Sequence, residues 1–297
     1  MKNALKLLIN NSKTIIFALM LIVVGLFTQI NQAPYLYLLE NNNLFIYDWS
    51  VIAERLAIPG GGAYLIAALL TQFFHLPFVG AIITTLCYGL IVWGSYQIIR
   101  KLYKGPALSG LAFLPIVFLL LSLENSLYRY QGHIAFLLMV LALWVYTSLM
   151  DKRWWMKWLI GVIASSLLYW FIGSAALVFV LGAILMDILC LTPKWYLSIL
   201  YIPAAVVMGV LAYQYAAVAD WHTAFTPLMY YDMVFTYYFQ LYAWGLFLLL
   251  PILAILLKYI PFKASIQRVI AVVGAVITCY ILLSFYSLVH TASNEKI

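Results

Sequence analysis

The stretch "TIIFALMLIVVGLF", residues 14–27, holds no charged side chain and is apolar on every side of a helix. A helix of this kind cannot lie on the surface of a soluble protein. Hydrophobic residues make up 67% of the 297-residue chain and charged residues 8%, far from the balance of a soluble domain. The chain is therefore predicted to be all-α, a polytopic bundle of transmembrane helices.

Further stretches have the length of about 20 apolar residues that a crossing needs. The predicted spans are 14–30, 78–99, 107–127, 133–150, 157–172, 174–191, 196–216, 235–257 and 269–290, with a hairpin turn at Gly173. The stretch 63–76 is short and stops before Pro77. It is interpreted as a re-entrant or interfacial helix or half of a kinked span, and the alternative is a short crossing. The sequence therefore predicts nine or ten membrane segments.

Lysine and arginine decide the predicted orientation, because cytoplasmic loops are enriched in both. If the basic clusters are cytoplasmic, all but three of the 16 basic residues lie on that side, and Arg55, Arg129 and Lys296 remain. We expect a bacterial inner-membrane protein with a cytoplasmic N-terminus and a periplasmic C-terminus. The clusters are Lys2/Lys6/Lys13, Arg100/Lys101/Lys104, Lys152/Arg153/Lys157, Lys194 and Lys258/Lys263/Arg268.

The chain is interpreted as one transmembrane domain, residues 1–297, with a first external loop at 31–62. Lysines precede the first span, but no small-residue cleavage site follows it, so that span is interpreted as an uncleaved anchor. The polar end "TASNEKI" stops abruptly. We expect the native chain to continue into an outer soluble part.

The first external loop contains a polar island, "NNNLFIYDWSVIAERLAIPGGG", residues 41–62. Within it, 44–57 places Leu44, Ile46, Trp49 and other apolar residues at near-helical spacing. This pattern is typical of an amphipathic helix in the plane of the membrane interface.

Two polar residues are the main candidates for chemistry. Asp48 either is a solvated charge at a helix end or binds a cation, or acts as a base, at the membrane surface. Arg129 either clamps a phosphate with its guanidinium fork or pairs with Glu124.

Other polar groups are weaker candidates. Glu54 and Arg55 are interpreted as surface charges, and His133 and His222 as solvated loop residues, although each histidine can also serve as a ligand or base. Asp232 lies in an aromatic-rich stretch that either forms an interface belt or stacks on a sugar. Asp187 either relays protons or extends toward Lys194.

Several classes of function have no support in the sequence. It contains no phosphate-binding glycine loop, serine elbow or zinc pair. The net charge of +7 reflects the predicted cytoplasmic lysines, so no nucleic-acid partner is expected.

The segments "YDWSVIAERLAIPGG" and "SGLAFLPIVFLLLSLENSLYRYQGH" resemble the GT-C superfamily of membrane glycosyltransferases, over about the first 135 residues. The run "PGGGAYLIAALLTQFFHLPFVGA" is similar to an uncharacterised family of Bacteroidota inner-membrane proteins. The superfamily resemblance implies that Asp48 is the acid of the first loop and Arg129 the arginine of the second, both facing a polyprenyl-phosphate-linked sugar. The chain departs from many members in having Trp49 where they have a second acid.

The resemblance implies a glycosyltransferase at the outer face, with Asp48 as the catalytic residue. Its substrate-binding residues would be Arg129, His133, Glu54, Arg55, His222 and Asp232. No metal site is predicted, and the cofactor stays open between none and a divalent cation beside Asp48. The expected partners are membrane lipid, the lipid-linked sugar and an outer soluble domain or protein. The alternatives are a non-catalytic scaffold or assembly subunit and, less favoured, a transporter or flippase.

Overall fold

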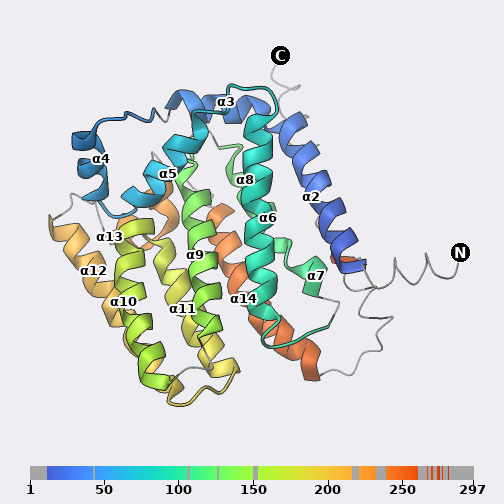
Figure 1. Ribbon diagram of the computed structural model, residues 1–297, viewed down its shortest axis with the longest axis vertical. Coiled ribbons are helices and arrows are strands. Elements are labelled where there is room, and N and C mark those ends of the chain that lie inside the picture. Colours follow the sequence, from blue (N-terminus) through green and yellow to red (C-terminus); the bar gives the residue numbers. More distant parts are fainter. Residues whose placement is uncertain are drawn as a thin grey trace, which may run out of the picture.

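The computed structural model describes residues 12–42, 44–105, 108–125, 127–149, 153–215, 221–231 and 239–259, and single positions between 266 and 280. These residues form a helical bundle without named strands, so the predicted all-α fold is confirmed (Figure 1). A single antiparallel bridge joins Tyr128 to Tyr231. The core is apolar and continuous through the bundle, and includes fully buried Tyr88, Phe136 and Phe179.

In the described part of the chain, five helices are long and apolar enough to cross a membrane. The count reaches six if the bent pair α2 (Ser12–Asn31) and α3 (Ala33–Asn42) is one span. The prediction of a polytopic membrane protein is thus supported, whereas nine or ten segments are not. The five are α6 (Val79–Ile99), α9 (Gln131–Ser148), α10 (Trp154–Ile172), η1 with α12 (Trp195–Leu200 and Tyr201–Tyr215), and α14 (Phe239–Tyr259).

Three predicted spans account for the difference between the nine spans that were predicted and the six that the structure supports at most. The stretch 107–127 divides into α7 (Leu108–Leu111) and α8 (Leu114–Ser122), and 174–191 gives the short helix α11 (Ala175–Leu189). The stretch 269–290 lies mostly outside the described residues.

Prolines explain the two sharp interruptions. Pro34 follows α2, and the axis turns by 69° between α2 and α3. Pro115 lies in the first turn of α8, directly after the break that follows α7. A proline lacks the N–H that would bond four residues back, and its ring clashes with that carbonyl. The break is tolerated inside the bundle because Ala112 and Phe113 are fully buried in protein.

The stretch 63–76 enters and leaves at one end of the bundle. Helix α5 (Gly61–Thr71) begins where Gly60 N donates to Trp170 O, at the C-terminal end of α10, 2.8 Å away. Just after α5, Gln72 Nε2 donates to Phe45 O in the first loop (3.0 Å), and α6 then starts from the same end (Figure 1). The fold therefore agrees with a re-entrant or interfacial helix rather than a crossing.

Arg100, Lys101, Arg153 and Lys258 lie at the opposite end of the bundle from Arg55 and Arg129. Arg100 and Lys101 follow α6, Arg153 precedes α10, and Lys258 closes α14. Figure 1 places these helix ends together at the bottom of the bundle, with α3 and α4 (Trp49–Leu56) at the other end. The charge segregation predicted from sequence is present in the fold.

Two glycines allow the first loop to close on the α10–α11 hairpin. Gly60 and Gly173 both have positive φ, +81° and +76°, a conformation that side chains rarely adopt. They also meet directly: a Cβ on Gly173 would lie 3.5 Å from Gly60 Cα and 2.3 Å from Met229 Sδ. Gly173 thus forms the predicted hairpin turn.

We expect Gly173→Ala to destabilise the protein by about 1–3 kcal/mol, since its backbone conformation is nearly restricted to glycine. Gly245→Ala is the matched control, because nothing lies within 4 Å of the added methyl group, and alanine favours a helix interior by up to about 1 kcal/mol. Thermal unfolding in detergent should show a lower midpoint for the first variant only. Equal midpoints would contradict this account of the turn.

Candidate functional site

Asp48 is fully exposed and serves as the N-cap of α4. Its Oδ1 accepts hydrogen bonds from Ser50 N (2.8 Å) and Ser50 Oγ (2.7 Å). These bonds, the hydroxyl bond first, lower the pKa of the Asp48 carboxyl below its ordinary value. Asp48 is therefore an ionised carboxylate facing solvent, engaged within its own turn.

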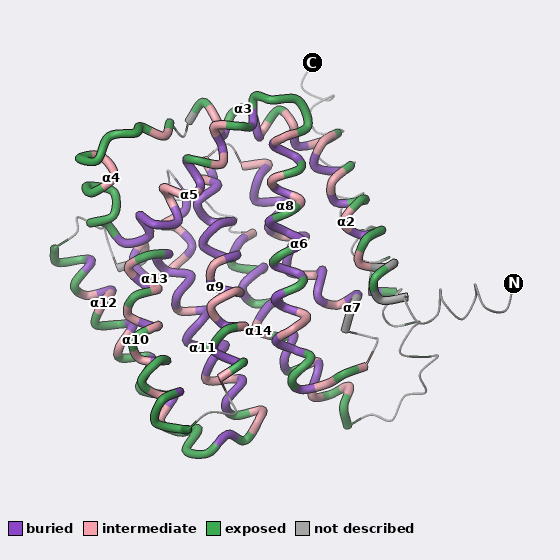
Figure 2. Tube along the Cα trace, in the orientation of Figure 1, coloured by how far each residue is buried: buried purple, intermediate pink, exposed green. Residues whose placement is uncertain are grey.

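Glu54 and Arg55 lie on the same short helix, which has no buried residue (Figure 2). The Arg55 guanidinium lies 4.9 Å from the centre of the Tyr64 ring on α5, a cation–π contact. Both positions are exposed, so they agree with the interpretation as surface charges. The helix is shorter than the predicted 44–57. Residues 44–48 form no regular secondary structure, and Asp48 caps the helix that begins at Trp49.

Arg129 lies in the loop before α9, and its backbone ties two outer segments together. Its N–H donates to Tyr230 O (2.9 Å), next to the bridge between Tyr128 and Tyr231. The side chain is half-buried. The main chain of Arg129 thus has a structural role.

His133 is enclosed rather than solvated, which corrects its interpretation as a loop histidine. It lies in the first turn of α9, fully buried, with Nε2 2.7 Å from Tyr88 Oη and Nδ1 2.8 Å from Tyr128 Oη. Tyr130 stacks on the ring at 5.2 Å. A neutral imidazole donates from one nitrogen and accepts at the other, so the two tyrosines satisfy it completely. It cannot contact a substrate in this state.

The remaining predicted site residues cannot be placed in a site. Asp232 lies outside the described residues, as does the side chain of His222 in α13 (Trp221–Phe225). Within the described part of the chain, no three His, Cys, Asp or Glu side chains gather as metal ligands. This arrangement gives no support for a cation beside Asp48.

The outer segments are joined largely by side chains that donate to backbone carbonyls, while Asp48 and His133 remain apart. Gln131 Nε2 donates to Gly60 O (2.9 Å), and Tyr230, at the end of η2 (Pro227–Tyr230), donates through its hydroxyl to Ile172 O (2.6 Å). The first bond joins the start of α9 to the first external loop, and the second joins η2 to the α10–α11 turn. Asp48 is solvated and His133 is sealed inside, so these two do not share a pocket.

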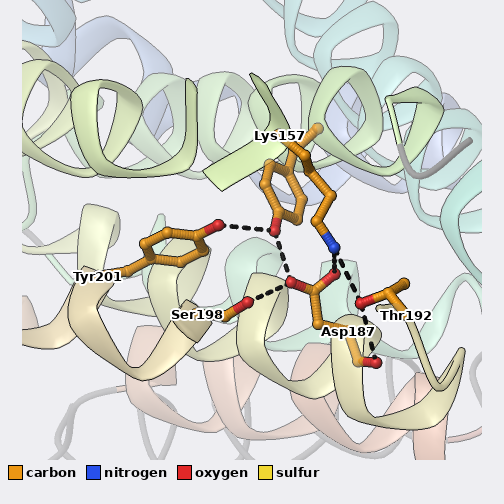
Figure 3. Close-up of polar contacts among 6 residues, drawn as sticks. Lys157, Asp187, Thr192, Ser198 and Tyr201 are labelled. Atoms are coloured by element: carbon orange, nitrogen blue, oxygen red, sulfur yellow. Dashed lines mark hydrogen bonds and ion pairs between the residues drawn. The ribbon is translucent and has the colours of Figure 1, made fainter. Parts of the chain in front are cut away.

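The most concentrated polar chemistry lies at the opposite, basic end, around Asp187 (Figure 3). The carboxylate is fully buried; Oδ1 binds Lys157 Nζ at 2.9 Å, and Oδ2 accepts from Tyr146 Oη at 2.7 Å. Ser198 Oγ also donates to Oδ2. Lys157, itself 4% exposed, donates further to Thr192 Oγ1 (2.9 Å). The hydroxyl oxygens of Tyr201 and Tyr146 lie 3.1 Å apart. Since Tyr146 donates its proton to Asp187, Tyr201 is the donor in this pair.

The α10–α11 hairpin explains why these residues meet. Lys157 lies in the first turn of α10 and Asp187 in the last turn of α11, at similar distances in sequence from Gly173. Lys194, the partner expected from sequence, instead lies 3.6 Å from the centre of the Trp154 ring. Counting residues outward from the predicted hairpin turn would have identified Lys157.

The charged groups of the Asp187 cluster have their partners inside the protein. Both carboxylate oxygens and the ammonium are bonded inside the protein, as a buried ion pair requires. The cluster encloses both charged groups, with Asp187 fully buried and Lys157 4% exposed. Its effect is to lock α9, α10, α11 and η1 together.

We expect Asp187→Asn to destabilise the fold by about 3–5 kcal/mol, because it leaves the Lys157 charge buried without a counter-charge. The double variant Lys157→Met/Asp187→Leu should recover most of that loss. Lys194→Met is the control on an exposed lysine and should change stability by less than about 1 kcal/mol. Thermal unfolding in nanodiscs measures all three. A double variant less stable than Asp187→Asn would refute the ion-pair explanation.

Glu124, after α8, lies beside Gln32 at the α2–α3 bend. Gln32 Nε2 also donates to Leu120 O (2.6 Å). Burial raises the pKa of the Glu124 carboxyl from 4.5 to about 7, although the Gln32 hydrogen bond opposes the rise. Since the folded-state pKa is the higher one, the protonated form stabilises the fold.

The contribution of Glu124 to stability should be complete below pH 4.5 and lost as pH rises through about 7. Glu124→Gln stays neutral and should lose less stability than wild type between about pH 5 and pH 8. Unfolding midpoints at both pH values test this expectation. Identical losses in the two proteins would show that Glu124 is not the group responsible.

Comparison with known proteins places the chain in one family. The sequence model of a family of unknown function (DUF6057) matches residues 8–297, so the chain belongs to that family. No curated protein and no solved structure matches it.

Proposed function

We propose that this chain is a non-catalytic membrane scaffold that anchors an outer soluble domain or partner protein. The observation that carries the proposal is the separation of Asp48 from His133. Acid–base catalysis needs groups within hydrogen-bond reach of one reacting atom, whereas Asp48 is solvated and His133 is enclosed by Tyr88 and Tyr128. The hydrogen bonds that join the outer segments would hold them in a fixed position, as a binding surface for a partner requires.

The proposed setting is a bacterial inner membrane, with the basic end in the cytoplasm. Helices α6 and α9 run in the same direction with α7 and α8 between them, and α9, α10, α11, α12 and α14 alternate in direction between the two ends (Figure 1). Taking α2 with α3 as one crossing, α7 with α8 as one broken crossing and α11 as a short one gives eight crossings, and the predicted span 269–290, which lies mostly outside the described residues, would be the ninth. In this arrangement α4 and the residues around Arg129 face the periplasm.

A GT-C-like glycosyltransferase is the second candidate, and one observation favours it. Asp48 is an exposed, ionised carboxylate in the first outer loop, where the resemblance places the acidic residue of that superfamily. Its free oxygen can activate an acceptor hydroxyl or bind a divalent cation. Arg129, from the second outer segment, would hold the phosphate of a polyprenyl-phosphate sugar.

Asp48→Asn separates the two candidates, because asparagine caps a helix as well as aspartate does and so preserves α4. For a scaffold, partner retention in affinity purification from native membranes should be unchanged. A transferase should instead lose turnover by roughly 100-fold or more with polyprenyl-phosphate sugars. Arg129→Lys should weaken donor binding, since an ammonium cannot reproduce the two-pronged grip.

Glu54→Gln is the control, since Glu54 is an exposed acid on the same helix. Sugar transfer by wild type that falls in Asp48→Asn but not in Glu54→Gln would overturn the scaffold proposal. Absence of transfer together with a co-purifying outer protein would support it. Transfer that is equal in all variants would remove Asp48 from the site.

A further inference from the structure

The residues just before α4 expose an unusual amount of apolar surface. Leu44 is 72%, Tyr47 92% and Trp49 77% exposed, and Ile46 is also exposed. We refer to residues 44–49 as the aromatic finger. A contiguous exposed apolar surface of this kind marks an interaction site.

Specific contacts fix the position of the aromatic finger. Within it, the Phe45 carbonyl accepts a hydrogen bond from Gln72 Nε2 (3.0 Å). At the end of α4, the Leu56 carbonyl accepts from Trp170 Nε1 (3.0 Å). Gln72 therefore holds the finger beside the end of α5, and Trp170 holds the other end of α4 beside the C-terminal end of α10.

The length of helix α10 indicates where the two membrane interfaces lie. Its 19 residues correspond to about 28 Å, close to the hydrocarbon thickness of about 30 Å. A lipid-facing stripe along it exposes Ile163, Leu167 and Phe171, four residues apart. Trp154 and Trp155 are exposed at its N-terminal end, as in the aromatic belt at a membrane–water interface. The other end of α10, where Trp170 contacts the C-terminal end of α4, then lies at the opposite interface.

We propose that Tyr47 and Trp49 insert into the lipid headgroup layer and anchor the first outer loop to the bilayer surface. Figure 1 places the start of α4 at the same end of the bundle as the start of α6, so the lipid leaflet at that end is within reach of the finger. Tyrosine and tryptophan suit this depth because each combines an apolar ring with a polar group. The charges of Asp48, Glu54 and Arg55 sum to −1, so the loop has no net positive charge to attract anionic lipid. The proposal holds for a scaffold and for a transferase alike.

Photo-crosslinking tests this contact in the full chain. Benzoylphenylalanine would replace Tyr47 or Trp49, with the protein in phosphatidylcholine nanodiscs, and mass spectrometry would detect lipid adducts. The same group at Leu167 is the positive control, because that side chain is 65% exposed on the lipid-facing stripe. Glu54 is the negative control, since it lies about 140° around α4 from Trp49.

We expect lipid adducts at positions 47 and 49 comparable to those at 167 and several-fold above those at 54, with no increase when phosphatidylglycerol is added. Adducts at 47 and 49 no higher than at 54, or adducts that require phosphatidylglycerol, would overturn the proposal. Crosslinks at 47 and 49 to another protein in native membranes would also overturn it. Position 44 provides a second probe of the finger if either aromatic variant is not monodisperse.

Discussion

Polar groups inside a bilayer have no water to bond with, and this constraint accounts for most features of the fold. Every broken helix must satisfy its free backbone groups within the protein. The interruption between α7 and α8 is accordingly buried, with Ala112 and Phe113 fully enclosed. The same requirement explains why Asp187 collects an ammonium and two hydroxyl donors around one carboxylate.

The two ends of the bundle meet this constraint in different ways. At the basic end, charged and hydroxyl side chains form the Asp187 cluster and join successive helices. At the other end, outer segments are joined mainly through carbonyl groups, such as Gly60 O and Ile172 O, which accept from Gln131 and Tyr230. Few titratable side chains are needed in that network. Asp48 and Glu54 consequently remain on the surface, which is the physical basis for favouring a scaffold over an enzyme.

A membrane anchor in the first loop fits either function. The aromatic finger would hold α4 at a defined depth, next to the carboxyl end of α10. A scaffold would thereby present its outer segments at a fixed height above the lipid. A transferase would thereby keep Asp48 at the level where the phosphate of a lipid-linked substrate lies. Membership in a family of unknown function is compatible with both.

The sequence by itself determined that the helices lie in lipid, that the fold is helical and that the charges are segregated. Apolar stretches such as 14–27, the basic clusters and the turn at Gly173 are local signals, and local physics suffices to interpret them. Only the tertiary structure decided which polar groups meet. The pairing of Asp187 with Lys157 depends on two antiparallel helices, and the enclosure of His133 depends on Tyr88, 45 residues away. The hairpin turn at Gly173 could have indicated Lys157, but the contact of Tyr88 with His133 leaves no pattern in a single sequence, because it arises only when distant helices pack.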